Sequence, residues 1–314
     1  MVHCSEFLWE VMPVPVPNFL MIGPPKCGTT ALYGTLAGHP QVFMSRVKEP
    51  YFFAFEDHPP AFAGPGAEHY CQHAVTDWES YQALFSGADG YAAIGEASPL
   101  YLTHYQPAQT AEAIRRRLPD VRLVAVLRQP AERAYSQFTY RRQQGHEPLR
   151  DFAAALAAED QRIAANWPPA CRYRRNGAYF SNLTPYFERF PREQLRIYLY
   201  DDLKDRPAEM LADLCGFLHL DPALMPGTVA PRNVTIWQRS QALGSLLRQP
   251  GWTKALLPTR LRRALGSRLR AWNRVKPPAL EPALRADLTL GYREELLRLQ
   301  DLIGRDLGHW LVAP

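Results

Sequence analysis

A glycine-rich loop near the N-terminus carries the residues with the clearest chemistry. The apolar run 19–22 is followed by Gly-Pro-Pro-Lys-Cys-Gly-Thr-Thr at residues 23–30 and then by a segment of helical character. Glycine lets the backbone turn its N–H groups toward an anion, and the N-terminus of a helix adds positive potential. Lys26 supplies a mobile positive charge, and the hydroxyls of Thr29 and Thr30 can donate further hydrogen bonds. The sequence therefore predicts a phosphate-binding loop.

The spacing in this loop differs from that of the P-loop in kinases and ATPases. That P-loop reads GxxxxGK[ST], with lysine directly after the second glycine. Here Thr29 follows Gly28, and Lys26 lies inside the loop. A kinase also needs a magnesium-binding aspartate after another strand, whereas the predicted strand over residues 122–127 is followed by Arg128. A nucleotide kinase or NTPase with a degenerate P-loop stays an alternative, and it predicts magnesium-dependent binding of ATP.

A second group of polar residues follows the predicted strand over residues 122–127. The segment reads Leu-Arg-Gln-Pro-Ala-Glu-Arg-Ala-Tyr-Ser, so Arg128 stands at the end of the strand and Ser136 in the helix that follows. A guanidinium fork and a hydroxyl placed in this way can hold one phosphate group. The residues alone leave two other roles open for Arg128, which are capping the helix and an ion pair with Glu132.

Together, the loop at 23–30 and the segment at 127–136 resemble the 5′-phosphosulfate loop and the 3′-phosphate motif of sulfotransferases that use 3′-phosphoadenosine 5′-phosphosulfate (PAPS). The resemblance extends from about residue 19 to residue 310, and it is to bacterial and heparan-type members. It implies transfer of a sulfuryl group from PAPS to a hydroxyl or amine of an acceptor, with adenosine 3′,5′-bisphosphate (PAP) as product and no required metal. The residues that would bind the nucleotide are Lys26, Cys27, Gly28, Thr29, Thr30, Arg128 and Ser136.

Two further residues are candidate nucleotide contacts. In the family, the segment that holds Tyr179 lies near the nucleotide, so we expect either an adenine or ribose contact or ordinary packing from this residue. Arg232 is the second candidate. It belongs to residues 226–282, which we expect to form a wall or lid on the acceptor side, because loops over a rigid scaffold carry specificity. The acceptor itself, whether a small molecule, lipid, glycan or peptide, is not readable from the sequence.

A third segment predicts the base that would take the acceptor proton. Lys48, Glu49 and Pro50 precede Tyr-Phe-Phe and resemble the Lys-Glu-Pro segment of heparan-type sulfotransferases, in which the glutamate is the base. The aromatic run would exclude water, and Lys26 suits the leaving group because its ammonium can move onto the bridging oxygen. The other interpretation of Glu49 is a salt bridge to Lys48 or to a nearby arginine. Glu96, which follows another predicted strand, is the reserve base.

Two alternatives to this chemistry stay open. Many small-molecule sulfotransferases use a histidine base, for which this chain offers, outside any motif that we can match, His39, His58, His104 and His146. A non-catalytic nucleotide-binding or scaffold protein would keep the fold without the chemistry. The presence together of Lys26, Arg128, Ser136 and the candidate base Glu49 speaks against that class.

These side chains need a scaffold that brings them together. Short apolar runs bounded by turn residues alternate with helical periodicity, which predicts an α/β protein whose parallel sheet is covered on both faces by helices. With the resemblance, this implies a three-layer, P-loop-like fold. The expected strands are 18–23, 41–44, 91–95, 121–127 and 195–200, and the expected helices are 29–37, 107–117, 131–144, 149–166, 180–190, 207–218 and 284–307. Ligands of such sheets bind beyond the carboxyl ends of the strands.

The composition fits one globular domain over residues 1–314, with an N-terminal extension at 1–17. Hydrophobic residues make up 46% of the chain, and the net charge of +5 gives the positive field that polyanionic nucleotides require without indicating nucleic-acid binding. Five cysteines without paired spacing predict neither a disulfide framework nor a zinc site, which favours the cytoplasm. No apolar run is long enough for a transmembrane segment. The basic stretch at 260–274 leaves contact with a membrane surface or an anionic acceptor open.

Overall fold

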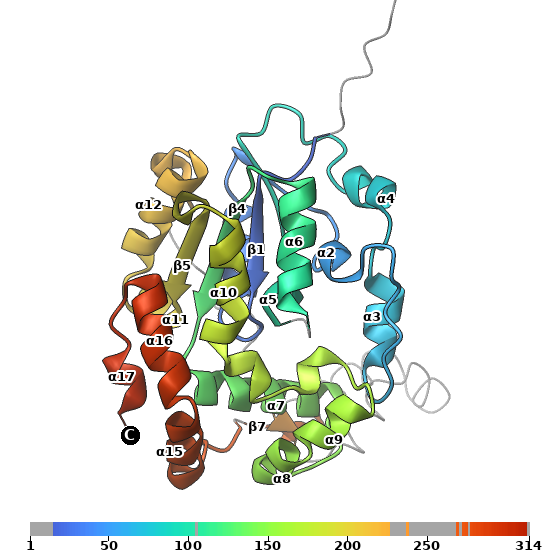
Figure 1. Cartoon of the computed structure of the whole chain (residues 1–314), viewed down its shortest axis with the longest axis vertical. Coiled ribbons are helices and arrows are strands. Elements are labelled where there is room, and N and C mark those ends of the chain that lie inside the picture. The colour runs from blue at the N-terminus through green and yellow to red at the C-terminus, as the bar shows by residue number, and fades with distance from the viewer. Residues whose placement is uncertain are drawn as a thin grey trace, which may run out of the picture.

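A five-stranded parallel sheet with strand order β2-β3-β1-β4-β5 forms the centre of the structure (Figure 1). The computed structural model describes residues 15–103, 106–226, 237–238, 268–269, 272–275 and 277–312. The strands of this sheet are β1 (Phe19–Gly23), β2 (Val42–Met44), β3 (Ala93–Ala97), β4 (Arg122–Leu127) and β5 (Leu195–Leu199). All five were predicted, and β3 alone is displaced, by two residues. The predicted α/β fold class is therefore confirmed.

Helices connect the strands in the right order for parallel crossovers. Their bounds are α1 (Thr29–Leu36), α2 (Phe52–Phe55), α3 (Ala67–His73), α4 (Trp78–Ala83), α5 (Leu100–Thr103), α6 (Pro107–Arg117), α7 (Pro130–Gln144), α8 (Phe152–Ala157), α9 (Glu159–Ala164), α10 (Tyr179–Arg189), α11 (Tyr200–Asp205), α12 (Pro207–Leu218), α15 (Pro282–Gly291), α16 (Arg293–Ile303) and α17 (Gly308–Leu311). Two short strands, β6 (Trp237–Gln238) and β7 (Arg274–Val275), pair antiparallel.

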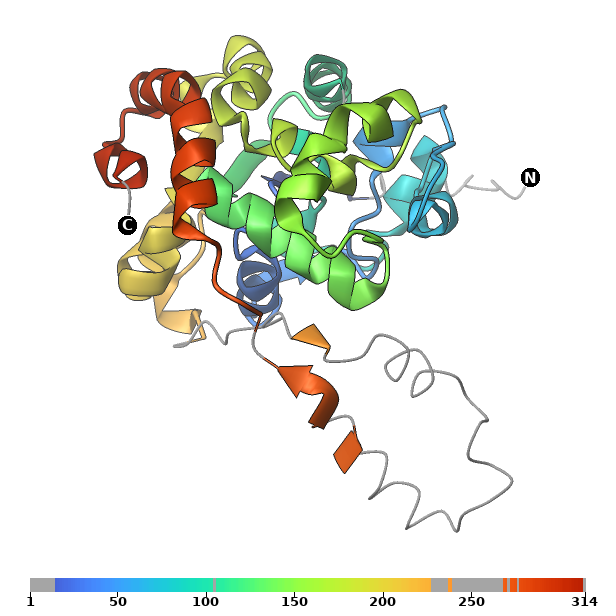
Figure 2. The same cartoon turned by 90° about the horizontal axis from the view of Figure 1, so that it is seen from below.

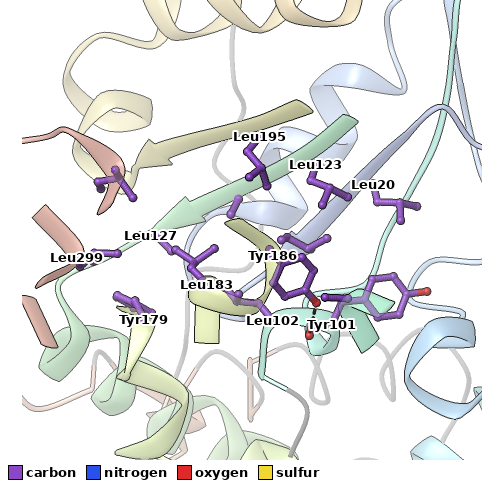
Figure 3. Close-up of a cluster of buried hydrophobic side chains, with 14 of the residues drawn as sticks. Leu20, Tyr101, Leu102, Leu123, Leu127, Tyr179, Leu183, Tyr186, Leu195 and Leu299 are labelled. Atoms are coloured by element: carbon purple, nitrogen blue, oxygen red, sulfur yellow. Dashed lines mark hydrogen bonds between the residues drawn. The ribbon is translucent and has the colours of Figure 1, made fainter. Parts of the chain in front are cut away.

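Alternate residues of each strand bury their side chains on opposite faces of the sheet, as the pleat requires. Leu20 and Leu123 belong to the core cluster that α5, α6, α10 and α16 cover, whereas Phe19 and Val124 pack against α1 and α12 on the other face. Figure 3 shows the first of these faces, where Leu183 and Tyr186 of α10 meet the strand leucines. The Tyr186 hydroxyl donates a hydrogen bond of 2.7 Å to the carbonyl of Tyr101. Burial on both faces explains why the strands are continuous apolar runs.

Two helices that the sequence predicted as continuous are interrupted. The predicted helix at 149–166 begins only at Phe152 and divides at Ala158 into α8 and α9, and the predicted helix at 284–307 divides at Tyr292 into α15 and α16. Tyr292 stands at the second break. Tyr292 is buried, and its hydroxyl donates to the carbonyl of Arg174 at 2.8 Å, a tertiary contact that helical periodicity does not reveal.

The carboxyl ends of the strands point toward α7, which lies across them (Figure 1). Figure 2, seen from below, shows α7 in front of the sheet, with α3 beside it. The chain leaves β1 through Gly23, whose φ of +119° lies in the region that favours glycine and whose Cβ, if present, would lie 2.3 Å from the carbonyl oxygen of Pro99. This close approach sets the loops after β1 and β3 side by side.

Candidate active site

A cavity of about 450 Å³ lies at the carboxyl ends of the strands. Residues that follow β1, β3, β4 and β5 all contribute to its wall, as expected for a ligand site in a parallel sheet. Its volume falls within the range of about 300–1,000 Å³ that small-molecule sites occupy. The structure brings together at this cavity most of the residues that the sequence singled out, namely Lys26, Gly28, Thr29, Thr30, Glu49, Arg128 and Ser136.

The glycine-rich loop forms an anion cradle at one end of this cavity. Gly28 adopts a φ of +91° directly before α1, and Lys26 has a φ of +72°, a left-handed conformation that disfavours residues with a side chain. In the described part of the chain, the N–H groups of Thr29 and Thr30 donate no hydrogen bond, because they belong to the first turn of the helix. These N–H groups are therefore available to an anion.

The ammonium of Lys26 lies in a partly buried, cationic environment. Its Nζ is 3.9 Å from the ring centroid of Tyr140, a cation–π contact made from α7. Burial, and after it the positive charge of Arg128, lowers the pKa of Lys26 to about 8. A bound anion would counter both effects, so the environment of Lys26 fits a negatively charged ligand.

Arg128 stands at the end of β4, where it lines the cavity and also makes the ion pair with Glu132 that the sequence left open. One of its terminal nitrogens lies 3.2 Å from a carboxylate oxygen of Glu132. Its guanidinium carbon is 4.9 Å from the ring centroid of Tyr200. The Nε of Arg128 is buried and has no partner among the described residues. Buried donors are normally paired, so this N–H can still donate a hydrogen bond.

Two predicted nucleotide contacts lie behind the cavity wall. Tyr179 is 1% exposed, and its hydroxyl donates to the carbonyl of Arg128 at 2.8 Å, so its ring packs in the core and does not line the cavity. The Cys27 side chain is fully buried in the core on the α1 face. Burial raises the pKa of its thiol to about 11. Any contribution of Cys27 to anion binding comes from its backbone.

Glu49 enters the cavity from a strained turn between β2 and α2. Both Glu49 and Tyr51 are left-handed, with φ of +62° and +59°, on either side of Pro50. One carboxylate oxygen of Glu49 lies 3.0 Å from Nζ of Lys48, and the other accepts a 2.6 Å hydrogen bond from the Tyr51 hydroxyl. Such backbone strain persists only where the surroundings hold it, which is common at functional sites. The carboxylate is thus fixed in place.

The aromatic run after Glu49 does not enclose it as predicted. Phe52 and Phe53 point into the core, where Phe52 stacks on Tyr81 at 4.5 Å between ring centroids and Phe53 lies near Tyr101. Their position follows from the short helix α2, which turns these side chains away from the cavity. Tyr51 is the member of the run that contacts Glu49.

Glu96, the predicted reserve base, does not line the cavity. Its carboxyl group is fully buried beneath the cavity floor and accepts a 2.6 Å hydrogen bond from the Tyr101 hydroxyl, while its second oxygen has no partner among the described residues. Burial raises the pKa of Glu96 to about 7. The side chain points into the core because alternate residues of β3 face opposite sides. Glu96 therefore has no access to an acceptor.

The raised pKa of Glu96 predicts a pH effect on stability. In the unfolded chain this carboxyl ionises near pH 4.5, so stability falls as the pH rises from about 4.5 to 7, by roughly 3 kcal/mol. We expect the difference in unfolding free energy between wild type and Glu96→Gln to change by about this amount between pH 5 and pH 8. Urea unfolding at the two pH values measures it. An equal difference at both would contradict the burial of an ionisable Glu96.

Two histidines line the cavity, and the sequence reasoning considered only one of them. His146 was named among the predicted candidates, whereas His69 was not. His39 and His58 are not among the residues that line the cavity, and His39 binds the backbone carbonyl of Asp221 instead. His104 lies outside the described residues. The sequence signal that could have identified His69 is its position on a short amphipathic helix next to Tyr70.

The predicted acceptor-side segment is described only in part. Arg232 lies outside the described residues, as do most of residues 226–282 and of the basic stretch at 260–274. In the described part of the chain, side chains of α3 and α7 and of the turn after α7 form another part of the cavity wall. These are His69, Tyr70, Gln137, Tyr140, Arg141, Gln144 and His146.

The described residues contain neither a cluster of metal-binding side chains nor a membrane-spanning helix. No three histidine, cysteine, aspartate or glutamate side chains are grouped there in a way that could hold a metal ion. None of the described helices combines the length and the apolar character that crossing a bilayer requires.

Comparisons with known proteins agree with the geometry of the cavity. The bifunctional heparan sulfate N-deacetylase/N-sulfotransferase 2 of Bos taurus is 29% identical over 219 residues, which are 67% of this chain and 22% of the bovine protein. The membrane-associated sulfotransferase kil1 of Dictyostelium discoideum is 33% identical over 125 residues, which are 40% of this chain and 23% of that protein. The chain thus spans about a fifth of the length of the curated relatives it matches.

A solved structure extends the likeness over nearly the whole chain. The crystal structure of a sulfotransferase from Alicyclobacillus acidocaldarius matches with a TM-score of 0.75 and 29% sequence identity, and the match covers 95% of this chain and 99% of that one. The model of the sulfotransferase family matches residues 17–223, which is more than half of the chain. The phosphate loop, Glu49 and Arg128 all lie within that match, and the chain belongs to the sulfotransferase family.

Proposed function

We propose that this protein transfers a sulfuryl group from PAPS to a hydroxyl or amine of an acceptor, with Glu49 as the base. One observation carries the proposal. The phosphate loop, Arg128 and Glu49 line a single cavity, and Lys48 links the loop to the carboxylate. Its Nζ donates to Thr30 Oγ1 at 2.9 Å and lies 3.0 Å from Glu49. The candidate base is therefore one side chain away from the site for the transferred group.

The residues of the cavity have distinct roles in this reaction. PAPS supplies an activated sulfuryl group and a nucleotide leaving group. The N–H groups and hydroxyls of Thr29 and Thr30 bind its 5′ side, and Arg128 with Ser136 binds its 3′-phosphate. Lys26 neutralises the charge that develops on the bridging oxygen, and Glu49 takes the acceptor proton while the nucleophile attacks in line. Positioning and electrostatics supply most of the rate, as in phosphoryl transfer.

The acceptor is proposed only by class. The wall formed by α3 and α7 is polar and aromatic, which suits a hydroxyl- or amine-bearing molecule better than a long alkyl chain. Since some relatives carry heparan sulfate N-sulfotransferase in their names, a de-N-sulfated heparan sulfate is the first acceptor to test. A simple sugar, a fatty alcohol and a tyrosine peptide complete a panel that separates the classes.

The proposal is tested first by ligand binding and then by turnover. We expect PAP to raise the melting temperature without added metal, and ATP with magnesium to have a smaller effect. Radiolabelled PAPS with the acceptor panel then measures transfer. Stabilisation by magnesium–ATP alone would favour a kinase or NTPase, and PAP binding without transfer or PAPS hydrolysis would favour a non-catalytic protein. A cytoplasmic location stays part of the proposal and is tested by cell fractionation.

Arg128 is expected to act mainly through the 3′-phosphate. Arg128→Gln should weaken the binding of PAPS by about 10- to 100-fold, the range of a charge-assisted hydrogen bond, and should leave adenosine 5′-phosphosulfate almost unaffected. Competition binding with the two nucleotides measures the ratio. Arg175→Gln removes an exposed arginine paired with Asp160 and serves as the control. An unchanged preference in Arg128→Gln would make Arg128 a structural residue.

A further inference from the structure

The helix α3 brings an unassigned histidine to the candidate base. The Nε2 of His69 lies 3.4 Å from the Tyr51 hydroxyl oxygen, which in turn is 2.6 Å from Oε2 of Glu49. The rings of Tyr51 and His69 meet edge to face, with centroids 6.2 Å apart. Glu49, Tyr51 and His69 thus form a continuous chain of polar atoms from the cavity interior to an exposed side chain.

We propose, resting on the proposed role of Glu49, that Tyr51 and His69 relay the acceptor proton from Glu49 to solvent. The acceptor gives its proton to Glu49 as the sulfuryl group is transferred. The Tyr51 hydroxyl then rotates toward Nε2 of His69, whose neutral ring carries its proton on Nδ1. Tyr51 gives its proton to Nε2 as its oxygen takes the proton from Oε2 of Glu49, and His69 releases the Nδ1 proton to water. Exchange with water returns His69 to the Nδ1–H tautomer. One proton enters the chain and one leaves it, and Tyr51 ends as it began.

The surroundings of Tyr51 suit a group that passes protons without becoming ionised. Tyr51 is 3% exposed, and its N–H donates to Ser98 Oγ at 3.2 Å, which fixes the ring. Burial, followed by the charge of Glu49, raises the pKa of Tyr51 far above its ordinary value. Its hydroxyl therefore stays protonated between turnovers. The other oxygen of Glu49 faces Lys48, whose ammonium has no lone pair to accept a proton.

The surroundings of His69 suit the end of such a relay. His69 is exposed and lines the cavity, so it can exchange protons with water. Partial burial and the neighbouring His73 lower its pKa, while Glu49 and Glu68 oppose them. His69 is therefore mainly neutral at pH 7 and able to accept a proton. Tyr70, also on α3, packs against Tyr51 and His69 and is itself uncharged because burial raises its pKa.

The test uses removal and chemical rescue of the imidazole. With PAPS and the panel acceptor that turns over fastest, we expect His69→Ala to lower kcat by about tenfold, less than loss of the base itself, and to leave the Kd for PAP unchanged. Added imidazole should restore kcat in a concentration-dependent way. His58→Ala, which removes an exposed histidine outside the cavity, should have normal kcat and no response to imidazole.

A double variant separates this inference from the proposed function. In Glu49→Gln, which has no proton to pass on, adding His69→Ala should cause no further loss. If Glu49→Gln is fully active, the base assignment and the relay both fail. If Glu49→Gln is inactive but His69→Ala has wild-type kcat, or has lost activity that imidazole does not restore, the relay alone fails and the proposed function stands.

Discussion

Glu49→Gln is expected to lower kcat by roughly 10² to 10⁴ while the Kd for PAP stays nearly constant, because the amide keeps the shape of the side chain but cannot take a proton. The structure predicts that the variant folds. The amide oxygen can still accept the hydrogen bond from Tyr51, and the ion pair that is lost, with Lys48, is about one third exposed, so its loss costs little stability.

The measurement combines single-turnover kinetics with thermal unfolding of the same preparations. Glu112→Gln is the matched control, since it makes the same replacement in an exposed carboxylate that pairs with Arg189 outside the cavity. We expect its kcat and melting temperature to equal those of the wild type. Full activity of Glu49→Gln, or a loss that follows its melting temperature, would remove Glu49 from the role of base and direct attention to the cavity histidines.

Lys26→Ala is expected to lower turnover by at least about a hundredfold and to weaken nucleotide binding less, because a positioned charge acts more strongly on the transition state than on the ground state. Lys26→Met is the better-matched variant, because its unbranched side chain can still pack against the ring of Tyr140. In the wild type the centroid of this ring lies 3.9 Å from the ammonium nitrogen of Lys26. The two should lose similar activity. Lys204→Ala, which removes an exposed lysine of α11, is the control.

The pH dependence of PAP binding gives an independent measure of Lys26. Its pKa of about 8 means that Lys26 is cationic below that pH and neutral above it. PAP affinity should therefore fall as the pH rises through about 8, and this step should be absent in Lys26→Met. Calorimetric titrations between pH 6.5 and 9.5 would measure it. Near-normal turnover of Lys26→Ala, or the same pH step in both proteins, would contradict the assignment of the phosphate loop.

The parts of the site that could be predicted from sequence are those that depend on short motifs at strand ends. Lys26, Arg128 and Glu49 each follow a strand of a parallel sheet, and parallel strands place their carboxyl ends at one edge. Their convergence at one cavity therefore follows from the sheet order alone. The order of the strands does not predict which face of the sheet a side chain points to. For this reason Glu96, at the end of β3, was predicted to serve as a reserve base although its side chain faces the core.

The contacts that sequence could not predict come from segments whose position depends on packing. The helix α3 lies in the long connection between β2 and β3, and no local pattern indicates that His69 would meet Tyr51. Tyr179 is a similar case. Its segment does lie beside the cavity, as the resemblance implied, but a hydrogen bond to the Arg128 carbonyl uses its hydroxyl. For both His69 and Tyr179, a contact with a residue far away in the sequence determines the position of the side chain, and no short motif predicts that contact.

If PAPS is the donor and Glu49 the base, as proposed, the contact of Lys48 with both Thr30 and Glu49 favours binding of the donor before the acceptor. The ammonium of Lys48 pairs with the carboxylate that would take the acceptor proton. A donor anion bound at Thr30 competes for that ammonium and draws its charge toward the sulfuryl group. An acceptor that binds before the donor would therefore face a Glu49 carboxylate that is still paired with Lys48. An acceptor that binds after the donor would face a carboxylate that is free to take its proton. In this order of binding, the acceptor would react only when the donor is already bound. An acceptor that binds alone would dissociate unchanged.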